Sequence, residues 1–255
     1  MLGEVSRGGK QRFIIEVEKI LSKKKPNEKG AVLAGGIMAD IEEMKNRIIQ
    51  ALGDNLLCLF FSGSRVRGEA LKDSDYDFMA IVSKLDEEKI YSMREALADL
   101  HGVSMYVLDR DDLRTIHKAM FLQLVHSEKL YGDFEYSLPS KEEVREFVNF
   151  WRRERLDDIR HYLILPHSQE KINSVLYPFL KRASLYLSCL VYAETGILPK
   201  TRKELLAYLE RTKSNNLWIN MMKTLDDWDS CKSKYFENPL PLLLQIETFY
   251  RTLRL

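Results

Sequence analysis

Two aspartates separated by one residue, Asp75 and Asp77, are the side chains of this sequence best suited to bind a divalent cation. Side chains alternate along a strand, so both carboxylates would point to one face of an extended segment. There they would repel each other strongly unless a cation lay between them. Oxygen ligands with few other protein donors suit Mg²⁺, which also takes phosphate oxygens and water. The pair predicts a site for a metal ion and a phosphorylated ligand.

A glycine-serine turn precedes the aspartates. Gly63 has no Cβ, so backbone N–H groups there can approach a ligand closely, and the Ser64 hydroxyl adds a donor. Backbone amides at the mouth of a helix favour phosphate, and Arg65 and Arg67 add positive charge nearby. Alone, the turn fits an ordinary strand-to-helix connection and the aspartates fit a solvated pair. Together they predict a phosphate cradle beside a metal site.

Short apolar segments frame these residues. The run at 56–61 (LLCLFF) is continuously apolar and bounded by turn residues, which predicts a strand buried on both faces. Two more strands are expected at 77–82 and 103–108, and helices at 37–52, 65–71 and 87–100. Helices and strands that alternate around a small sheet predict an α/β or α+β pattern in this half of the chain.

The pattern changes after about Gly132, beyond which there is almost no strand signal. Amphipathic segments lie at 141–163, 172–194, 202–209, 217–225 and 241–253, and Ser140 and Glu143 form a capping box before the first of them. They predict a bundle of four or five helices, so the whole chain is expected to be α+β. One more helix is expected at 12–25. We therefore expect an N-terminal helical extension at 1–35, a domain with the sheet at 36–135 and a helical domain at 136–255.

The combined motif resembles a known family. Gly63-Ser64, Gly68 and Ser74-Asp75-x-Asp77 between two apolar strands look like the signature of the DNA polymerase β-type nucleotidyltransferase superfamily, in its minimal and aminoglycoside-type branch. The resemblance is sharp over 56–82, and 121–132 (FLQLVHSEKLYG) resembles the segment that closes the catalytic domain. It implies a small mixed sheet flanked by helices and transfer of a nucleoside monophosphate from a nucleoside triphosphate, expected to be ATP, with release of pyrophosphate. The implied metal is Mg²⁺ or Mn²⁺.

The resemblance also implies roles for individual residues. Asp75 and Asp77 match the metal ligands and are the expected catalytic residues. The residues expected to bind the nucleotide are Gly63, Ser64, Arg67 and Ser74.

The sequence departs from the family at one position. Such proteins usually carry a third carboxylate on a later strand, and the equivalent position in 103–108 holds Ser104, which cannot replace a carboxylate as ligand or base. The nearby Asp109, Asp111 and Asp112 are expected in a loop and a helix cap. The alignment could differ by a residue or more, or the base could come from elsewhere, for example Glu142 or Glu143. A third alternative is a protein that binds nucleotide and transfers it poorly or not at all, as a regulatory or toxin–antitoxin-like module.

The helical half, over 184–206, resembles the substrate-binding or HEPN-like domain that often accompanies these transferases. Arg155 and His161 have a spacing near the Arg-x(4–6)-His pattern of HEPN ribonucleases, which leaves a ribonuclease as a further alternative. However, they lie in the first helix of this half, where the nuclease motif is not expected. The side chains Trp151, Leu156 and Ile159 of the same segment favour an ordinary core stripe.

Composition limits the partners. The 255 residues include 39 Lys and Arg against 38 Asp and Glu, a net charge of +1, which excludes bulk polycation behaviour and gives no support to nucleic acid as acceptor. The three cysteines are too few and too far apart for a disulfide framework or a zinc cluster. With no secretory signal in the first residues and no apolar run long enough to span a membrane, a cytoplasmic protein is expected. The acceptor is expected to be a small molecule or a protein, and a homodimer is compatible with the sequence.

Overall fold

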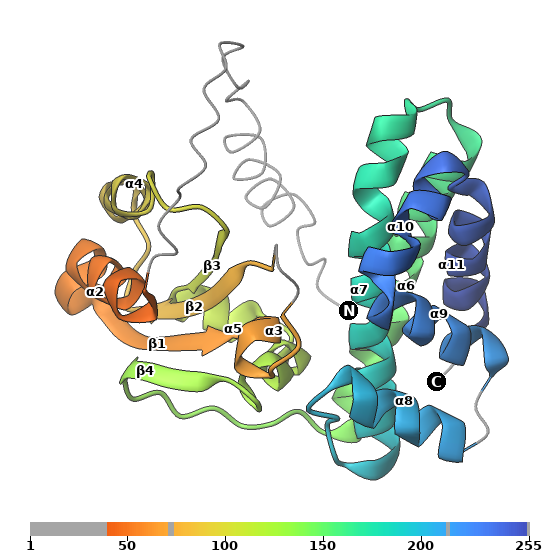
Figure 1. Cartoon of the computed structure of the whole chain (residues 1–255). Coiled ribbons are helices and arrows are strands. Elements are labelled where there is room, and N and C mark those ends of the chain that lie inside the picture. The colour runs from red at the N-terminus through yellow and green to blue at the C-terminus, as the bar shows by residue number, and fades with distance from the viewer. Residues whose placement is uncertain (1–39, 71–73, 213–214, 254–255) are drawn as a thin grey trace, which may run out of the picture. The chain divides into compact units, whose positions relative to one another are not determined.

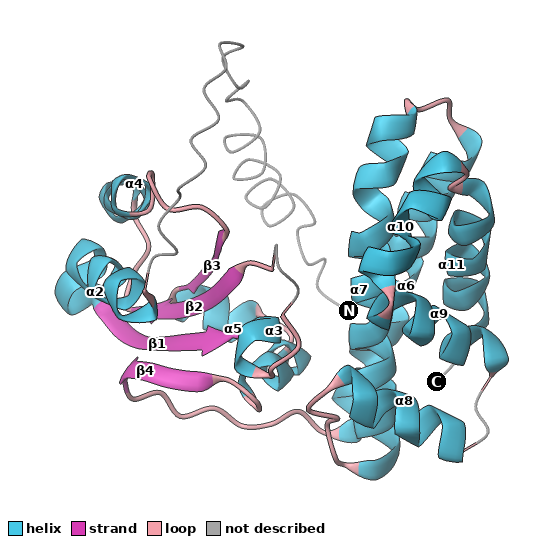
Figure 2. Cartoon of the chain, in the orientation of Figure 1, coloured by secondary structure: helices cyan, strands magenta, loops and turns pink. Residues whose placement is uncertain are grey.

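The computed structural model describes residues 40–70, 74–212 and 215–253. Within them a four-stranded sheet with its flanking helices comes first, and a run of helices follows (Figures 1 and 2). The fold is α+β, as the sequence predicts. The helix expected at 12–25 lies outside the described residues.

The sheet is small and mixed. Its strands are β1 (Leu56–Ser62), β2 (Tyr76–Val82), β3 (Val103–Leu108) and β4 (Glu128–Gly132), in the order β3-β2-β1-β4. Strand β2 pairs with β3 in parallel, whereas β1 pairs antiparallel with both β2 and β4. The edge strand β4 was not predicted as a strand, because its short, exposed sequence EKLYG carries no apolar alternation.

Alternate residues of the strands face two different cores. Phe61, Phe78 and Ala80 pack with α2 (Ile41–Leu52) and α4 (Glu87–Ala96), which cover one face of the sheet in Figure 1. On the other face, the set Cys58, Phe60, Met79, Ile81 and Leu108 packs with the helix η2 (Lys118–Leu124) and with Leu113 of α5 (Arg110–Thr115). Because side chains alternate, Asp77 belongs to the second face, at the end where β2 begins.

The helical half forms a core of its own, which Ala119 and Leu122 of η2 join. It consists of α6 (Lys141–Ile164), α7 (Gln169–Thr195), α8 (Arg202–Arg211), α9 (Asn216–Asp226), α10 (Trp228–Glu237) and α11 (Leu240–Thr252). The predicted capping box is present, with Ser140 and Glu143 bonded reciprocally. The described bundle has six helices rather than four or five, because α10 follows α9 after a single residue and has no apolar period of its own. None of the helices described is long and apolar enough to cross a membrane.

Candidate functional site

Asp77 is the second residue of β2, and it lies between two serines on the neighbouring strands. In the register of the sheet its Cα pairs with Ser62 of β1 on one side and with Ser104 of β3 on the other. The Ser62 hydroxyl donates to the Asp77 carbonyl oxygen at 3.3 Å, and the Ser104 side chain hydrogen-bonds to the Asp77 carboxyl group. Ser104 therefore lies beside Asp77, and its equivalence with the third carboxylate of the family stays a prediction.

The glycine-serine turn lies directly against this carboxylate. Gly63 begins the short helix α3 (Gly63–Val66) with φ of 81°, a conformation that only glycine adopts readily. A Cβ on Gly63 would overlap the Asp77 carboxylate, so the turn and the side chain are in close contact. The structure thus brings together the two halves of the sequence motif.

Asp75 lies just before β2, on an exposed part of the chain. Its Oδ1 atom is 3.7 Å from the position that a Cβ on Gly102 would occupy, so it sits beside the turn that leads into β3. The negative charge of Asp75 contributes to raising the pKa of the Asp77 carboxyl group. Because β2 begins at Tyr76, Asp75 precedes the strand, and the expectation that both carboxylates bind one metal ion stays a prediction.

Arg65 is committed to holding the segment that carries the aspartates. Its Nε and Nη2 atoms donate to the Ser74 carbonyl oxygen at 3.1 and 2.6 Å, and its guanidinium lies over the Tyr76 ring at 3.9 Å. The Tyr76 side chain in turn stacks on Phe61 in the core. Arg65 therefore positions the loop before β2, and it keeps its positive charge there because its hydrogen-bond partner is a neutral carbonyl oxygen.

Arg67 is held by a buried ion-pair network that reaches the helical half. Its Nε atom donates to Glu69 at 3.1 Å, and the Glu69 side chain is only 10% exposed. The other Glu69 oxygen accepts from the backbone N–H of Arg202, at the start of α8, and the Arg202 Nη2 atom donates to the Glu69 carbonyl oxygen at 2.9 Å. The Arg202 Nη1 atom reaches the Leu225 carbonyl oxygen of α9 at 3.4 Å. This network fixes Arg67 through its Nε atom alone.

The pKa of Asp77 is raised, first of all by burial and then by the charge of Asp75. Three contributions oppose this rise: the positive charge of Lys181, the hydrogen bond from Ser104 and the positive charge of Arg67. Lys181 belongs to α7, so the helical half supplies a cation to the site. Sequence reasoning missed Lys181, Glu69 and Arg202, because no local pattern distinguishes a charged residue on an amphipathic helix that contacts a distant loop.

The residues present fit a divalent cation held by two carboxylates. Asp75 and Asp77 offer oxygen ligands, and a cation bound by both would relieve the repulsion and burial that raise the Asp77 pKa. In the part of the chain that the structure describes, no group of three or more His, Cys, Asp or Glu side chains could hold a metal. Such a cation would take its remaining ligands from water and phosphate oxygens, as Mg²⁺ usually does.

The other carboxylates considered for the third position are occupied elsewhere. Asp109 caps α5 by accepting from the backbone N–H groups of Asp111 and Asp112, and the Asp112 side chain completes that capping box. The expected cap is therefore confirmed. Glu143 completes the capping box of α6 and pairs with Lys118 at 3.2 Å, whereas Glu142 pairs with Arg145 at 3.1 Å.

The spacing that suggested a ribonuclease does not bring its two residues together. Six positions along an α-helix rotate a side chain by about 240°, so Arg155 and His161 point about 120° apart on α6. Arg155 pairs with Asp158 at 2.5 Å, and the His161 ring lies 4.9 Å from the His167 ring. The two side chains have separate surroundings.

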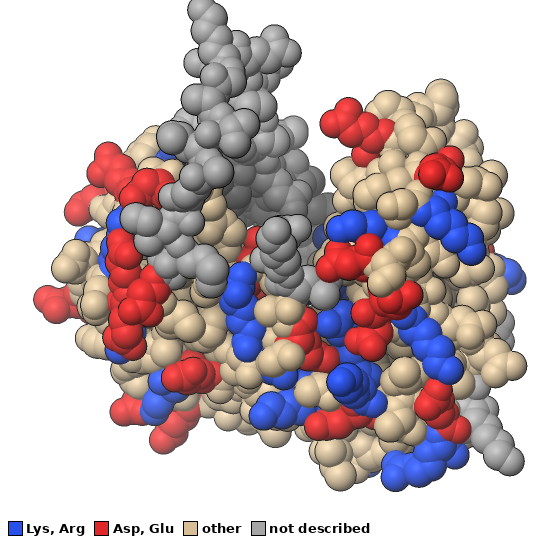
Figure 3. All heavy atoms as spheres, in the orientation of Figure 1, with Lys and Arg blue, Asp and Glu red and all other residues tan. Residues whose placement is uncertain are grey.

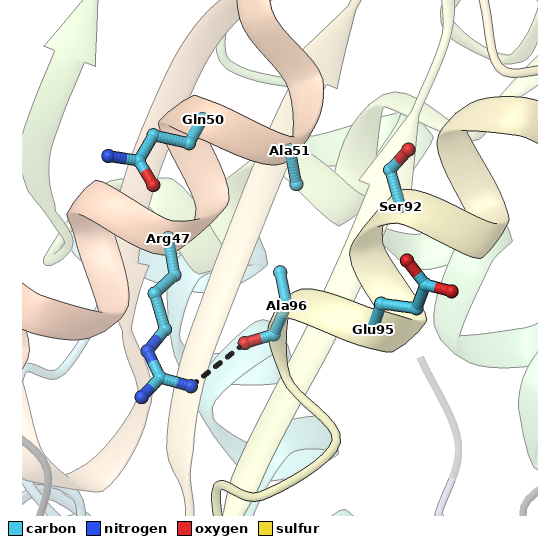
Figure 4. Close-up of a pocket in the computed structure, with 6 residues that line it drawn as sticks. All are labelled: Arg47, Gln50, Ala51, Ser92, Glu95 and Ala96. Carbon is cyan, nitrogen blue, oxygen red and sulfur yellow. Dashed lines mark hydrogen bonds between the residues drawn. The ribbon is translucent and has the colours of Figure 1, made fainter.

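Two surface hollows lie away from these residues. One, of about 460 Å³, lies between α2 and α4, where Arg47 donates to the Ala96 carbonyl oxygen at 3.2 Å (Figure 4). The other, of about 490 Å³, includes Asn55 and Ser83, at the opposite ends of β1 and β2 from Asp77. Figure 3 shows acidic and basic side chains mixed on the visible face, in line with the near-zero net charge.

Neither a protein-family model nor a curated protein matches the chain. Among solved structures, spectinomycin adenyltransferase AAD(9) from Enterococcus faecialis, with ATP and spectinomycin, is similar over 83% of this chain and 98% of its own, with 14% identity and a TM-score of 0.49. A toxin–antitoxin structure with AMP-PNP and a mutant of the toxin–antitoxin MntA–HpeT each cover 46% of this chain and 98% of their own, with 21% and 18% identity and TM-scores of 0.28. At these identities the similarity concerns the fold alone.

Proposed function

We propose that this protein is a metal-dependent nucleotidyltransferase that transfers a nucleoside monophosphate from a nucleoside triphosphate, with ATP the expected donor, to an acceptor hydroxyl. The observation that carries the proposal is the contact between the Asp77 carboxylate and the backbone of Gly63. This contact places a candidate cation ligand directly against a turn whose backbone N–H groups can bind phosphate.

Each residue of the site has a role in this proposal. Asp75 and Asp77 hold Mg²⁺ or Mn²⁺, which when bound neutralises charge on the phosphates. Gly63 and Ser64 bind the triphosphate with backbone and hydroxyl donors. Ser74 is the further residue expected to bind the nucleotide. The charges of Arg67 and Lys181, which already act on Asp77, attract the same anion.

The reaction is an in-line displacement at the α-phosphorus. The acceptor oxygen forms a bond to phosphorus, the bond to the bridging oxygen breaks, and pyrophosphate leaves with the electron pair. Ser104, which lies beside Asp77, is too weak a base to accept the proton of the acceptor hydroxyl. In this proposal the proton therefore passes to water. The protein contributes mainly position and charge stabilisation.

The test is nucleotide turnover by the Asp77→Ala variant. With ATP labelled at the α-phosphate, Mg²⁺ and a panel of acceptors that includes spectinomycin, we expect the wild type to release pyrophosphate. Loss of Asp77 should lower this rate by about 10³-fold. The matched control is Asp54→Ala, which removes an exposed aspartate at the far end of β1 and should keep full activity. Full activity in Asp77→Ala, with an unchanged circular dichroism spectrum, would reject the assigned site.

A second function is favoured by Ser104 in place of a third carboxylate. Without that group, the same residues could form a nucleotide-binding regulatory module that transfers little or nothing. Stoichiometric binding of ATP that requires Asp77, together with no pyrophosphate release across the whole acceptor panel, would select this alternative.

A further inference from the structure

A second group of charged and polar side chains lies inside the helical half. Arg155 of α6, Arg182 and Tyr186 of α7, and Tyr250 of α11 act on one another electrostatically, and we name them the arginine–tyrosine cluster. The Tyr186 and Tyr250 rings meet edge to face at 5.5 Å, and the Arg155 side chain hydrogen-bonds to Tyr186. These residues come from three helices that pack together.

Several donors of this cluster are unpartnered. The Tyr250 hydroxyl belongs to a fully buried residue and has no hydrogen bond, and the buried Arg155 Nε atom has none either. Arg182 is an exposed residue that makes no hydrogen bond and no ion pair within the described part of the chain, and partial desolvation and the positive charge of Arg155 lower its pKa. A buried donor without a partner costs about 1–3 kcal/mol, so such groups commonly mark the place of a missing ligand or water.

The charges of the cluster are also unbalanced. Arg155 and Arg182 carry two positive charges, and Asp158, which pairs with the Arg155 Nη1 atom at 2.5 Å, supplies one negative charge. A third guanidinium, that of Arg152, adds to the excess: its Nη1 atom reaches the Tyr250 carbonyl oxygen at 3.5 Å and its buried Nε atom is unpartnered. The cluster opens to solvent at Arg182, which is an exposed residue.

We propose that the arginine–tyrosine cluster is a binding site for a phosphate group. Guanidinium groups bind phosphate through several directed N–H donors, and the Tyr250 hydroxyl adds a donor from a third helix. A phosphate group has several acceptor oxygens and can therefore accept from donors on different helices. The bound group would be an inorganic phosphate ion or the phosphate of a small phosphorylated molecule. This site does not depend on the proposed nucleotidyl transfer.

The test is thermal unfolding of the full chain with added phosphate, at constant ionic strength and with EDTA present to remove divalent cations. We expect inorganic phosphate to raise the Tm of the wild type more than chloride does, because a ligand that binds only the folded state stabilises it. Arg182→Met and Tyr250→Phe should each weaken the apparent phosphate affinity by about tenfold. The controls are Arg153→Met, an exposed arginine on α6, and Asp77→Asn, which alters only the proposed metal site; both should respond like the wild type.

Tyr250→Phe keeps the test decisive. Because the hydroxyl it removes has no partner, this variant should unfold at the wild-type temperature or above when no phosphate is present. A full phosphate response in Tyr250→Phe and Arg182→Met would overturn the proposal, as would a wild type that responds equally to chloride. A parallel series with glycerol 3-phosphate separates the sources: an equal or larger response supports a phosphorylated molecule, and a response to inorganic phosphate alone supports the free ion.

Discussion

The end of the sheet that carries Asp75 and Asp77 is negatively charged, whereas the arginine–tyrosine cluster of the bundle is positively charged. In each region, charged groups of the same sign act on one another. At the sheet, burial and a second carboxylate raise the pKa of Asp77. In the bundle, burial and a second guanidinium lower the pKa of Arg182. In both places like charges are held together in partly desolvated surroundings, which is unfavourable unless an ion of the opposite sign joins them. This difference fits the two proposals, a cation site at the sheet and an anion site in the bundle.

Gly63→Ala is expected to have the largest effect, because it displaces the Asp77 carboxylate of the candidate metal site. The positive φ alone costs about 1–2 kcal/mol, and the new methyl group must displace the Asp77 carboxylate, which adds about 1–3 kcal/mol. Nucleotide turnover should fall by about 10²-fold through misplacement of Asp77. Chemical denaturation and the turnover assay measure the two effects.

Gly68→Ala is the matched control for this variant. Gly68 also has a positive φ, of 71°, but a Cβ there would meet no atom within 4 Å. Its cost should therefore be only the φ strain of about 1–2 kcal/mol. Equal losses of stability in the two variants would show that the contact between Gly63 and Asp77 has no energetic importance.

Arg202→Met is expected to have an intermediate effect, because it removes the side-chain contacts of Arg202 with Glu69, although the backbone N–H of residue 202 still donates to the Glu69 carboxylate. Glu69 would keep a buried charge with one partner fewer, which costs about 1–3 kcal/mol. Since Glu69 orients Arg67, the KM for ATP should rise several-fold while kcat changes less. Lys223→Met is the control, because its ion pair with Glu210 is exposed on both sides and should contribute at most about 1 kcal/mol. If Arg202→Met had the same KM for ATP as the wild type, the contact between Glu69 and Arg202 would have no part in nucleotide binding.

The smallest expected effects are shifts in Tm of a few degrees when Mg²⁺ or phosphate is added. These shifts test whether the sheet binds a cation and the bundle binds an anion. Mg²⁺ should stabilise the wild type and Arg182→Met, but not Asp77→Asn. Phosphate without metal should stabilise the wild type and Asp77→Asn equally, and Arg182→Met only at about tenfold higher phosphate concentration. Loss of both responses in either single variant would mean that the two sites are not independent.

Much of the sheet and its aspartates could be predicted from the sequence, because local patterns carry that information. The buried runs 56–61 and 78–82 are continuously apolar, so both strands are visible in the sequence, and Asp77 lies at the start of the second strand. The pairing of Asp77 with Ser104 follows once β2 and β3 are neighbours. The predicted caps at Asp109 and Ser140 depend on residues three positions apart, so they too are visible locally.

The remaining features depend on contacts between residues distant in the chain. Glu69 contacts Arg202, which lies 133 positions later in the chain. The positive charge of Lys181, in the helical half, acts on Asp77 in the half that contains the sheet. The arginine–tyrosine cluster joins three helices, and nothing in the sequence around Arg155 or Tyr250 indicates that their donors lack partners. Such features require the packed structure, since neither periodicity nor capping signals encode them.

Ser104 has a consequence for the acceptors that this protein could use. A general base at its position would contribute about 10²–10⁴-fold to the rate, and a serine hydroxyl cannot act as one at neutral pH. The rate should then follow the acidity of the acceptor hydroxyl itself, so that phenols react faster than sugar alcohols of similar size. A steep Brønsted plot across a series of substituted phenols would be the kinetic sign of this missing carboxylate.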